Sequence, residues 1–187
     1  MREVGSGFSY YFVPIGGQRD NYLNWVSGSG LKLPNAQKVI GTPGDYSIAM
    51  LINFDDVDTD PPDTYHKIVD FEDLGDGTGW YIHEGFLHPY NLDEVPETGD
   101  PPVTEQDWHL IVMTRVEGTV KGYVDNRRMF TLPDPDGDLR LGIEKVLHFL
   151  MDDDGGEETG GKIARLRIWK NPLTTTQAKS LKPRFVD

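Results

Sequence analysis

The sequence contains no cysteine among its 187 residues. A disulfide, a thiolate metal site and a cysteine nucleophile are therefore excluded. Cysteine usage also gives no indication of the cellular compartment in which the protein functions. Long apolar runs are also missing, so we do not expect the chain to insert into a membrane. The first residues show no signal-peptide pattern. Two settings stay open: an intracellular protein, or a mature or excised domain whose signal has been removed.

Basic residues are scarce as well. The chain has 18 Lys and Arg against 31 Asp and Glu, a net charge of −13. Phosphates would be repelled, which argues against nucleic acid and against an anionic membrane surface as partners. Cations, neutral sugars and basic proteins suit this charge better. Hydrophobic residues make up 37%, enough to bury a core, and the length fits one domain over residues 1–187.

Helical periodicity is almost absent, and about a dozen short runs have the alternation of β-strands. Residues 108–115 are apolar on both faces, which predicts a strand that is covered on both sides. The longest early run, residues 46–54, is predicted to cross the core with one apolar face, made of Tyr46, Ile48, Met50, Ile52 and Phe54. We therefore expect an all-β fold, a two-sheet antiparallel jelly-roll sandwich with one short C-terminal helix.

Two local motifs make this expectation testable. Asp125 and Asn126 separate two strand-like runs, and both residue types tolerate the left-handed conformation of a two-residue type I′ turn. Both are therefore predicted to have positive φ. Near the C-terminus, Thr174 and Gln177 are spaced as a capping box for a helix that continues to Leu181.

The most unusual stretch is residues 146–170. Two strand-like runs, residues 146–151 and 162–169, flank a glycine-rich loop that carries five carboxylates on Asp152, Asp153, Asp154, Glu157 and Glu158. Carboxylates at this density repel one another unless solvent or a cation compensates them. Hard oxygen ligands on a flexible loop suit calcium, whereas a charge run taken alone is typical of a solvated acidic turn. Both interpretations stay open.

The segments WHLIVMTRVEGTVKGYVDNRRMF and IARLRIWKNPLTTTQAKSL resemble the laminin-G-like, concanavalin A-like domains. Asn126 stands where that family usually has glycine. The resemblance is firmest over residues 46–181. Within the family, YHKIVDFED and HFLMDDDGGEETGG resemble a bacterial subgroup of secreted or surface-attached proteins, which implies an extracellular or cell-surface location.

The resemblance also implies a metal site. Related lectin-like domains hold calcium on a sheet rim, and the matching motifs fall on Asp70, Asp152, Asp153 and Glu157. Carboxylates from two segments would then converge on one ion, with backbone carbonyls of the glycine-rich loop completing its coordination.

For ligands, the resemblance implies a glycan or a protein partner. Sugar binding needs exposed aromatic rings beside polar groups that fix orientation. Trp80, Tyr81 and Tyr90 are the candidates, whereas Trp108 and Trp169 are expected to pack in the core or against the terminal helix. The hypothesis is a non-enzymatic, calcium-dependent binding module.

Two alternatives belong to other functional classes. The same jelly roll carries glucanases and lyases, and Asp70 and Glu72 stand two residues apart, roughly 6.5 Å along a strand and within the range of paired glycosidase carboxylates. The third carboxylate of glucanases is missing here, because the flanking positions hold Ile68 and Leu74. A structural or adhesion domain of a larger assembly is the other alternative.

Overall fold

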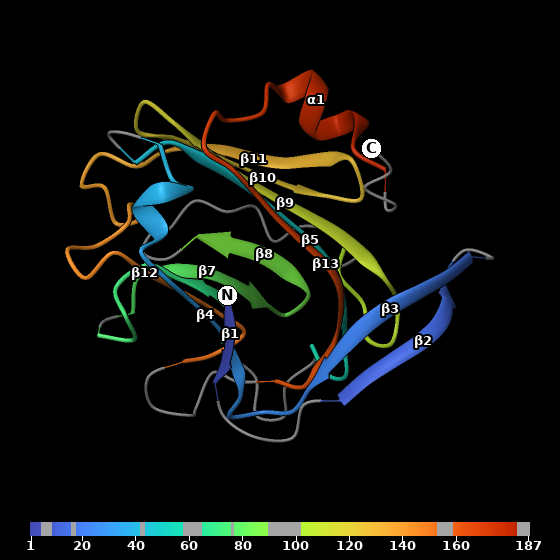
Figure 1. The fold of residues 1–187 in the computed structure, drawn as a ribbon. Coiled ribbons are helices and arrows are strands. Elements are labelled where there is room, and N and C mark those ends of the chain that lie inside the picture. The colour runs from blue at the N-terminus through green and yellow to red at the C-terminus, as the bar shows by residue number, and fades with distance from the viewer. Residues whose placement is uncertain are drawn as a thin grey trace.

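A computed structural model of the chain describes residues 1–4, 9–15, 18–41, 44–57, 65–75, 77–89, 102–152 and 159–182. Their strands form two antiparallel sheets that pack face to face, and a short helix follows the last strand (Figure 1). The predicted two-sheet jelly roll with one C-terminal helix is confirmed. In the described residues no helix has both the length and the apolar character that crossing a membrane would require.

The six-stranded sheet has the order β1-β4-β12-β6-β7-β8. Its strands come from both halves of the chain, so β12 lies between β4 and β6 although it is far from both in sequence. Their bounds are β1 Arg2–Val4, β4 Gly30–Pro34, β6 Tyr65–Asp70, β7 Gly79–His83, β8 Phe86–Pro89 and β12 Val146–Phe149.

The seven-stranded sheet has the order β11-β10-β9-β5-β13-β3-β2. We call the face of this sheet that points away from the six-stranded sheet its outer face. In the described part of the chain two helical segments accompany the sheets, the 3-10 helix η1 (Ala36–Lys38) and α1 (Thr175–Ser180). The strand bounds are β2 Ser9–Ile15, β3 Gln18–Trp25, β5 Tyr46–Phe54, β9 His109–Val116, β10 Thr119–Val124, β11 Arg127–Pro133 and β13 Gly161–Trp169.

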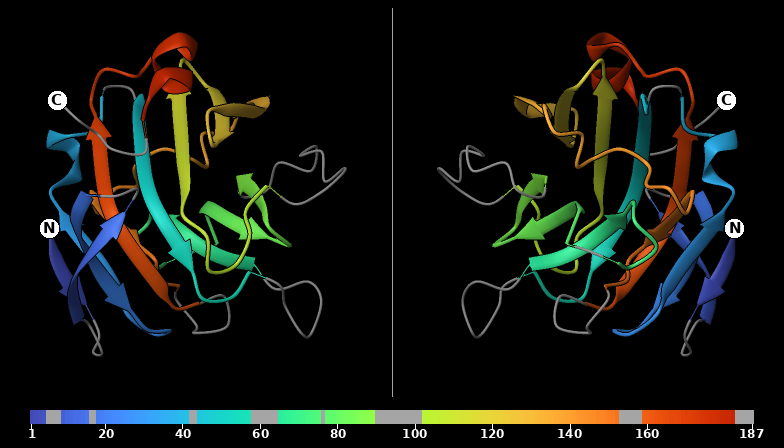
Figure 2. Two further views of the ribbon diagram at one scale, coloured as in Figure 1. Left: turned by 90° about the vertical axis from the view of Figure 1, so that its right-hand side faces the viewer. Right: turned by 90° about the vertical axis from the view of Figure 1, so that its left-hand side faces the viewer.

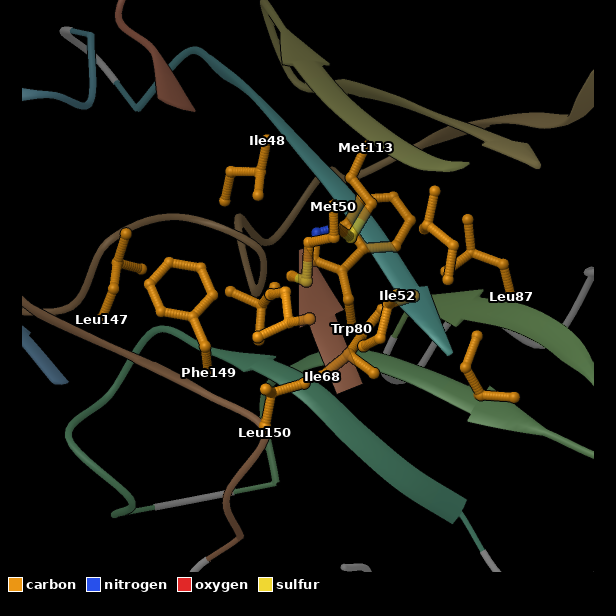
Figure 3. Close-up of a cluster of buried hydrophobic side chains, with 14 of the residues drawn as sticks. Ile48, Met50, Ile52, Ile68, Trp80, Leu87, Met113, Leu147, Phe149 and Leu150 are labelled. Carbon is orange, nitrogen blue, oxygen red and sulfur yellow. The ribbon is translucent and has the colours of Figure 1, made fainter. Parts of the chain in front are cut away.

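The main core fills the space between the sheets. Strand β5 crosses the core, as predicted, and all of its residues are buried. Met50 and Ile52 meet Ile68 and Phe149 of the opposite sheet (Figure 3). Each fully buried side chain of this size stabilises the fold by about 1.5–3 kcal/mol. Apolar burial therefore holds the two sheets together without any disulfide.

A second, smaller core lies on the outer face of the seven-stranded sheet. Ala49, Leu110, Val112 and Tyr123 pack there beneath Ala178 of α1, and Figure 2 places this helix at one end of the strands. Strand β9 is thus covered on both sides, as predicted.

The helix begins at the expected capping box. Thr174 Oγ1 accepts the Gln177 amide at 3.2 Å, and Gln177 Oε1 accepts the Thr174 amide at 2.8 Å. Both donors at the start of α1 are therefore satisfied.

The hairpin prediction is also confirmed. Asp125 and Asn126 connect β10 to β11 with φ of 47° and 68°. The Asp125 carboxylate ties this turn to the start of β9, because it accepts the Leu110 amide at 2.9 Å and lies 2.8 Å from His109 Nδ1. The Thr104 amide donates to His109 Nε2, so the ring proton is assigned to Nδ1, facing Asp125.

Candidate functional site

Two of the four predicted metal ligands meet in space. Asp70 ends β6, and Asp152 follows β12, which pairs with β6. The ammonium of Lys67 lies between them, 2.8 Å from Asp152 Oδ1 and 3.5 Å from Asp70 Oδ2. All three side chains are at most 1% exposed. Asp153 and Glu157 lie outside the described residues.

The surroundings of Asp70 leave little room for a metal ion on its carboxylate. Asp70 Oδ1 already accepts the amides of Glu72 and Leu74, at 3.1 and 2.9 Å, while Oδ2 faces Lys67. Within the described ranges, no three His, Asp or Glu side chains gather as a metal-binding group. A calcium site would therefore depend on Asp153 and Glu157, and it stays a prediction.

The Asp70 and Glu72 pair does not form a catalytic cleft in the described geometry. Strand β6 ends at Asp70, so Glu72 lies in the following turn and not two residues further along the strand. Asp70 is completely buried and paired with Lys67. A glycosidase carboxylate must reach the scissile bond, and Asp70 is not accessible to a substrate.

The predicted sugar-binding aromatics also lie inside. Trp80 has no exposed surface, its ring stacks on Phe130 with centroids 5.9 Å apart, and its Nε1–H donates to Tyr46 Oη at 2.9 Å. Tyr81 is 3% exposed, with Lys67 Nζ 5.4 Å from its ring centroid. Contrary to expectation, neither ring offers a face to a sugar. Tyr90 lies outside the described residues.

A different aromatic pair is partly exposed. The rings of Tyr22, on β3, and Trp108, just before β9, have centroids 5.9 Å apart at an angle of 57°. Strands β13 and β5 lie between β3 and β9, so three strand spacings of about 4.8 Å, or about 14 Å, separate the two backbones. The two side chains therefore lean toward each other across the outer face.

Basic groups border this aromatic pair. Arg165 and Arg167 alternate along β13 with Leu166 and Ile168, which pack against the main core, so the arginines lie on the outer face. Lys162, from the same strand, donates to Asn53 Oδ1 at 3.1 Å. We call this surface the aromatic-basic face, and it consists of Tyr22, Trp108, Lys162, Arg165 and Arg167.

The sequence alone did not predict that Trp108 lies on this face. Trp108 shares its alternation with Leu110 and Val112, a pattern typical of a core position. Only the packing shows that this side of β9 is the outer one, since Ile111 and Met113 lie in the main core while Leu110 and Val112 pack beneath α1. Trp169, in contrast, packs with the residues beneath α1 as expected.

A separate open cleft of about 900 Å³ lies between η1 and two loops, residues 72–75 and 137–145. At its wall, Asp73 Oδ1 accepts hydrogen bonds from Lys32 Nζ and His148 Nε2, each at 2.7 Å. The hydrogen bond from Lys32, followed by that from His148, lowers the pKa of Asp73. No aromatic side chain is among the described residues that line this cleft, so it lacks a stacking surface for a sugar.

Solved structures with the same fold come from several functional classes. Domain 4 of an extracellular arabinanase from Geobacillus stearothermophilus, in complex with arabinotriose, is 16% identical with a TM-score of 0.63, over 94% of this chain and 81% of that one. A structure of botulinum neurotoxin type C, a toxin whose cell entry depends on two ganglioside molecules, is 16% identical with a TM-score of 0.64, over 95% of this chain and 44% of that one.

A mutant Trypanosoma rangeli sialidase with trans-sialidase activity is 12% identical with a TM-score of 0.63, over 93% of this chain and 29% of that one. The chain thus spans less than half of the toxin and sialidase chains, and these identities establish the fold alone. No curated protein matches the sequence. The sequence model of the concanavalin A-like lectin/glucanases superfamily matches residues 26–179, and the chain therefore belongs to this superfamily.

Proposed function

We propose that the chain is a non-enzymatic binding module that recognises a glycan at the aromatic-basic face. The observation that carries this proposal is the partly exposed Tyr22 and Trp108 pair. Aromatic rings stack on the apolar faces of sugars, and nearby polar groups fix the orientation of the hydroxyls. Lys162, which is partly exposed and is held by a hydrogen bond to the buried Asn53, provides such a group on strand β13.

Proteins of the same fold support this class of function by analogy. The arabinanase domain was solved with an oligosaccharide, and the toxin depends on gangliosides. Those ligands belong to those proteins, and the low identity transfers no binding residue to this chain. By the same analogy we propose an extracellular or cell-surface setting.

The alternatives lack a comparable observation. A hydrolase would need accessible paired carboxylates, and Asp70 is buried against Lys67. A protein-binding or adhesion role would use an exposed apolar surface. Among the described residues the exposed large hydrophobic side chains are Met1, Val26 and Ile143, which are separate from one another in the sequence.

We also propose calcium binding, with ligands from the acidic loop alone. Lys67 already compensates Asp70 and Asp152, so Asp153 and Glu157 would have to hold the ion. Calcium would order that glycine-rich loop by pairing with its carboxylates.

A glycan array probed with and without calcium tests the proposal. The unmodified protein should bind a subset of glycans, and Trp108→Ala should weaken that binding at least tenfold because it removes the stacking ring. Ile143→Ala is the control, since Ile143 is 91% exposed and lies on the rim of the separate cleft. An array without signal, or equal binding by Trp108→Ala, would count against glycan recognition at this face.

A further inference from the structure

Trp108 lies just outside the strand that follows it. The pairing of β9 with β5 ends at His109 and Ile52, so the ladder fixes the chain only up to the residue after Trp108. The preceding segment turns at Gln106, which has φ of 60°. A residue other than glycine keeps this left-handed conformation only where its surroundings enforce it. Contacts outside the ladder must therefore set the direction of the Trp108 ring.

Hydrogen bonds hold the residues on both sides of Trp108. Thr104 Oγ1 donates to Asp107 Oδ2 at 3.2 Å, and the Thr104 amide donates to His109 Nε2 at 3.0 Å. Both sequence neighbours of Trp108 are thus tied to the same residue. Residues 104–109 form a closed loop, and the ring of Trp108 extends from it.

The ring of His109 connects this loop to the neighbouring turn. Its Nδ1 lies 2.8 Å from Asp125 Oδ2, and Asp125 Oδ1 accepts the Leu110 amide at 2.9 Å. Burial raises the pKa of Asp125, but the hydrogen bonds from His109 and from the Leu110 amide bring it below its ordinary value. The carboxylate therefore stays charged and keeps the proton of the neutral ring on Nδ1, which leaves Nε2 as the acceptor for Thr104.

We infer that His109 and Asp125 are positioning residues, which hold Trp108 in place for the glycan while the His109 ring is neutral. This inference rests on the proposed function. A neutral ring accepts the Thr104 amide at Nε2, whereas a protonated ring carries a hydrogen on both nitrogens. Two N–H groups would then face each other across 3.0 Å, so the hydrogen bond that closes the loop is lost.

The protonated ring has a second partner within reach. Thr104 Oγ1 lies 3.1 Å from His109 Nε2, so the hydroxyl accepts the new N–H group while the Thr104 amide turns away. That turn changes the backbone four residues before Trp108 and displaces its ring. Histidine changes its charge between pH 5 and 8, and glycan binding should therefore weaken as the pH falls through this range.

The surroundings of His109 confine the change to the side of the ring that faces the loop. Among the described residues, the charged groups in contact with the ring or with Thr104 are Asp125, from the turn between β10 and β11, and Asp107. Ile52, the register partner of His109 on β5, is apolar. Asp125 accepts the Nδ1 hydrogen in both charge states, so protonation alters only the contacts of Nε2.

Fluorine NMR of protein labelled with 5-fluorotryptophan follows Trp108 directly. We expect the Trp108 resonance, assigned with Trp108→Phe, to move between pH 7.5 and pH 5.5. The resonances of the buried Trp25 and Trp80 should stay in place and report that the chain is folded. His109→Gln cannot be protonated and should keep the Trp108 resonance fixed. His148→Gln is the matched control, since His148 contacts Asp73 at the separate cleft, and it should leave the movement unchanged.

Glycan binding is measured at the same two pH values, on an array of neutral oligosaccharides that includes arabinotriose. The signal of the unmodified protein should fall at least threefold from pH 7.5 to pH 5.5, and that of His109→Gln should not depend on pH. Asp125→Asn is a second variant, which keeps an acceptor for the Leu110 amide. Its transition should lie at lower pH, because the protonated ring loses its carboxylate partner.

The outcomes separate the inference from the proposed function. A Trp108 resonance that does not respond to pH, or that responds equally in His109→Gln, would overturn the inference and leave glycan binding intact. Array signals that stay constant between the two pH values would overturn it as well. A blank array at both pH values would instead overturn the proposed function, and the role of His109 in glycan binding with it, whatever the resonance shows.

Discussion

The ammonium of Lys67 lies 2.8 Å from the Asp152 carboxylate, and neither side chain is more than 1% exposed. With Asp70 on its other side, Lys67 joins the end of β6 to the residues after β12. Buried carboxylates need a compensating charge. Lys67 supplies it for Asp70 and Asp152, two of the four residues that the resemblance implies as calcium ligands.

Replacing Lys67 should therefore be costly. Lys67→Met would leave two buried carboxylates without their cation, and losing one partner of a buried ion pair destabilises a protein by about 3–5 kcal/mol. Urea unfolding measures the loss. Lys179→Met, at an exposed position of α1, is the control and should change stability by less than about 0.5 kcal/mol. If Lys67→Met lost as little stability as the control, the contacts of Lys67 with Asp70 and Asp152 would not be what holds β6 to the residues after β12.

The calcium prediction has its own measurement. If Asp153 and Glu157 bind the ion only in the folded chain, a hundredfold excess over the dissociation constant stabilises the fold by about 2.7 kcal/mol. Thermal melts in calcium should then show a higher Tm than melts in chelator, and Glu157→Gln should reduce the difference. Identical Tm values for the unmodified protein would leave the loop as a solvated acidic turn.

His66 makes stability depend on pH. It is 5% exposed, and neither ring nitrogen has a hydrogen-bond partner in the described part of the chain. Burial lowers the pKa of His66 below 6.5, so the unfolded chain binds this proton more readily than the folded one. Stability should decrease as pH falls below 6.5 towards the folded-state pKa.

Urea unfolding at several pH values between 5 and 8 measures this dependence. His66→Phe removes the titrating group and should flatten the curve over the upper part of this range. If the variant and the unmodified protein lose stability in parallel, another group is responsible.

The turn between β10 and β11 is strained at Asn126, and a substitution there should relieve the strain. Asn126 has φ of 68°, and its buried Oδ1 has no hydrogen-bond partner among the described residues. Asn126→Gly should stabilise the protein by about 0.5–1 kcal/mol, because glycine adopts positive φ freely and removes the unsatisfied oxygen. Asn126→Ala should destabilise it by about 1 kcal/mol. Thermal melts compare the two variants, and the opposite order of stability would contradict this account.

Strands with strong alternation were predictable from the sequence. Strand β5, with its apolar face from Tyr46 to Phe54, has the predicted bounds. Such a pattern depends on residues close in sequence. The break in β13 was not predicted: the alternation of Ala164 with Leu166 continues evenly in the sequence, but the register shifts between Ile163 and Arg165.

The candidate site was less predictable, because it depends on contacts between distant strands. The convergence of Asp70 and Asp152 was expected, whereas Lys67 was not counted, since nothing in a strand of alternating residues shows that a lysine is buried. Trp108 was expected inside and is partly exposed, whereas Trp80 was expected at a ligand and is buried. Which face of a strand is the outer one follows from which of its residues pack between the two sheets.

The burial of the four tryptophans has an optical consequence. Trp25 and Trp80 are at most 1% exposed, whereas Trp108 and Trp169 are partly exposed. The first two should emit at short wavelengths and resist quenching by iodide until the chain unfolds, and the other two should be quenched in the folded state. A sugar that covers Trp108 would then protect part of the emission from iodide, so that one fluorescence titration could follow ligand occupancy separately from unfolding.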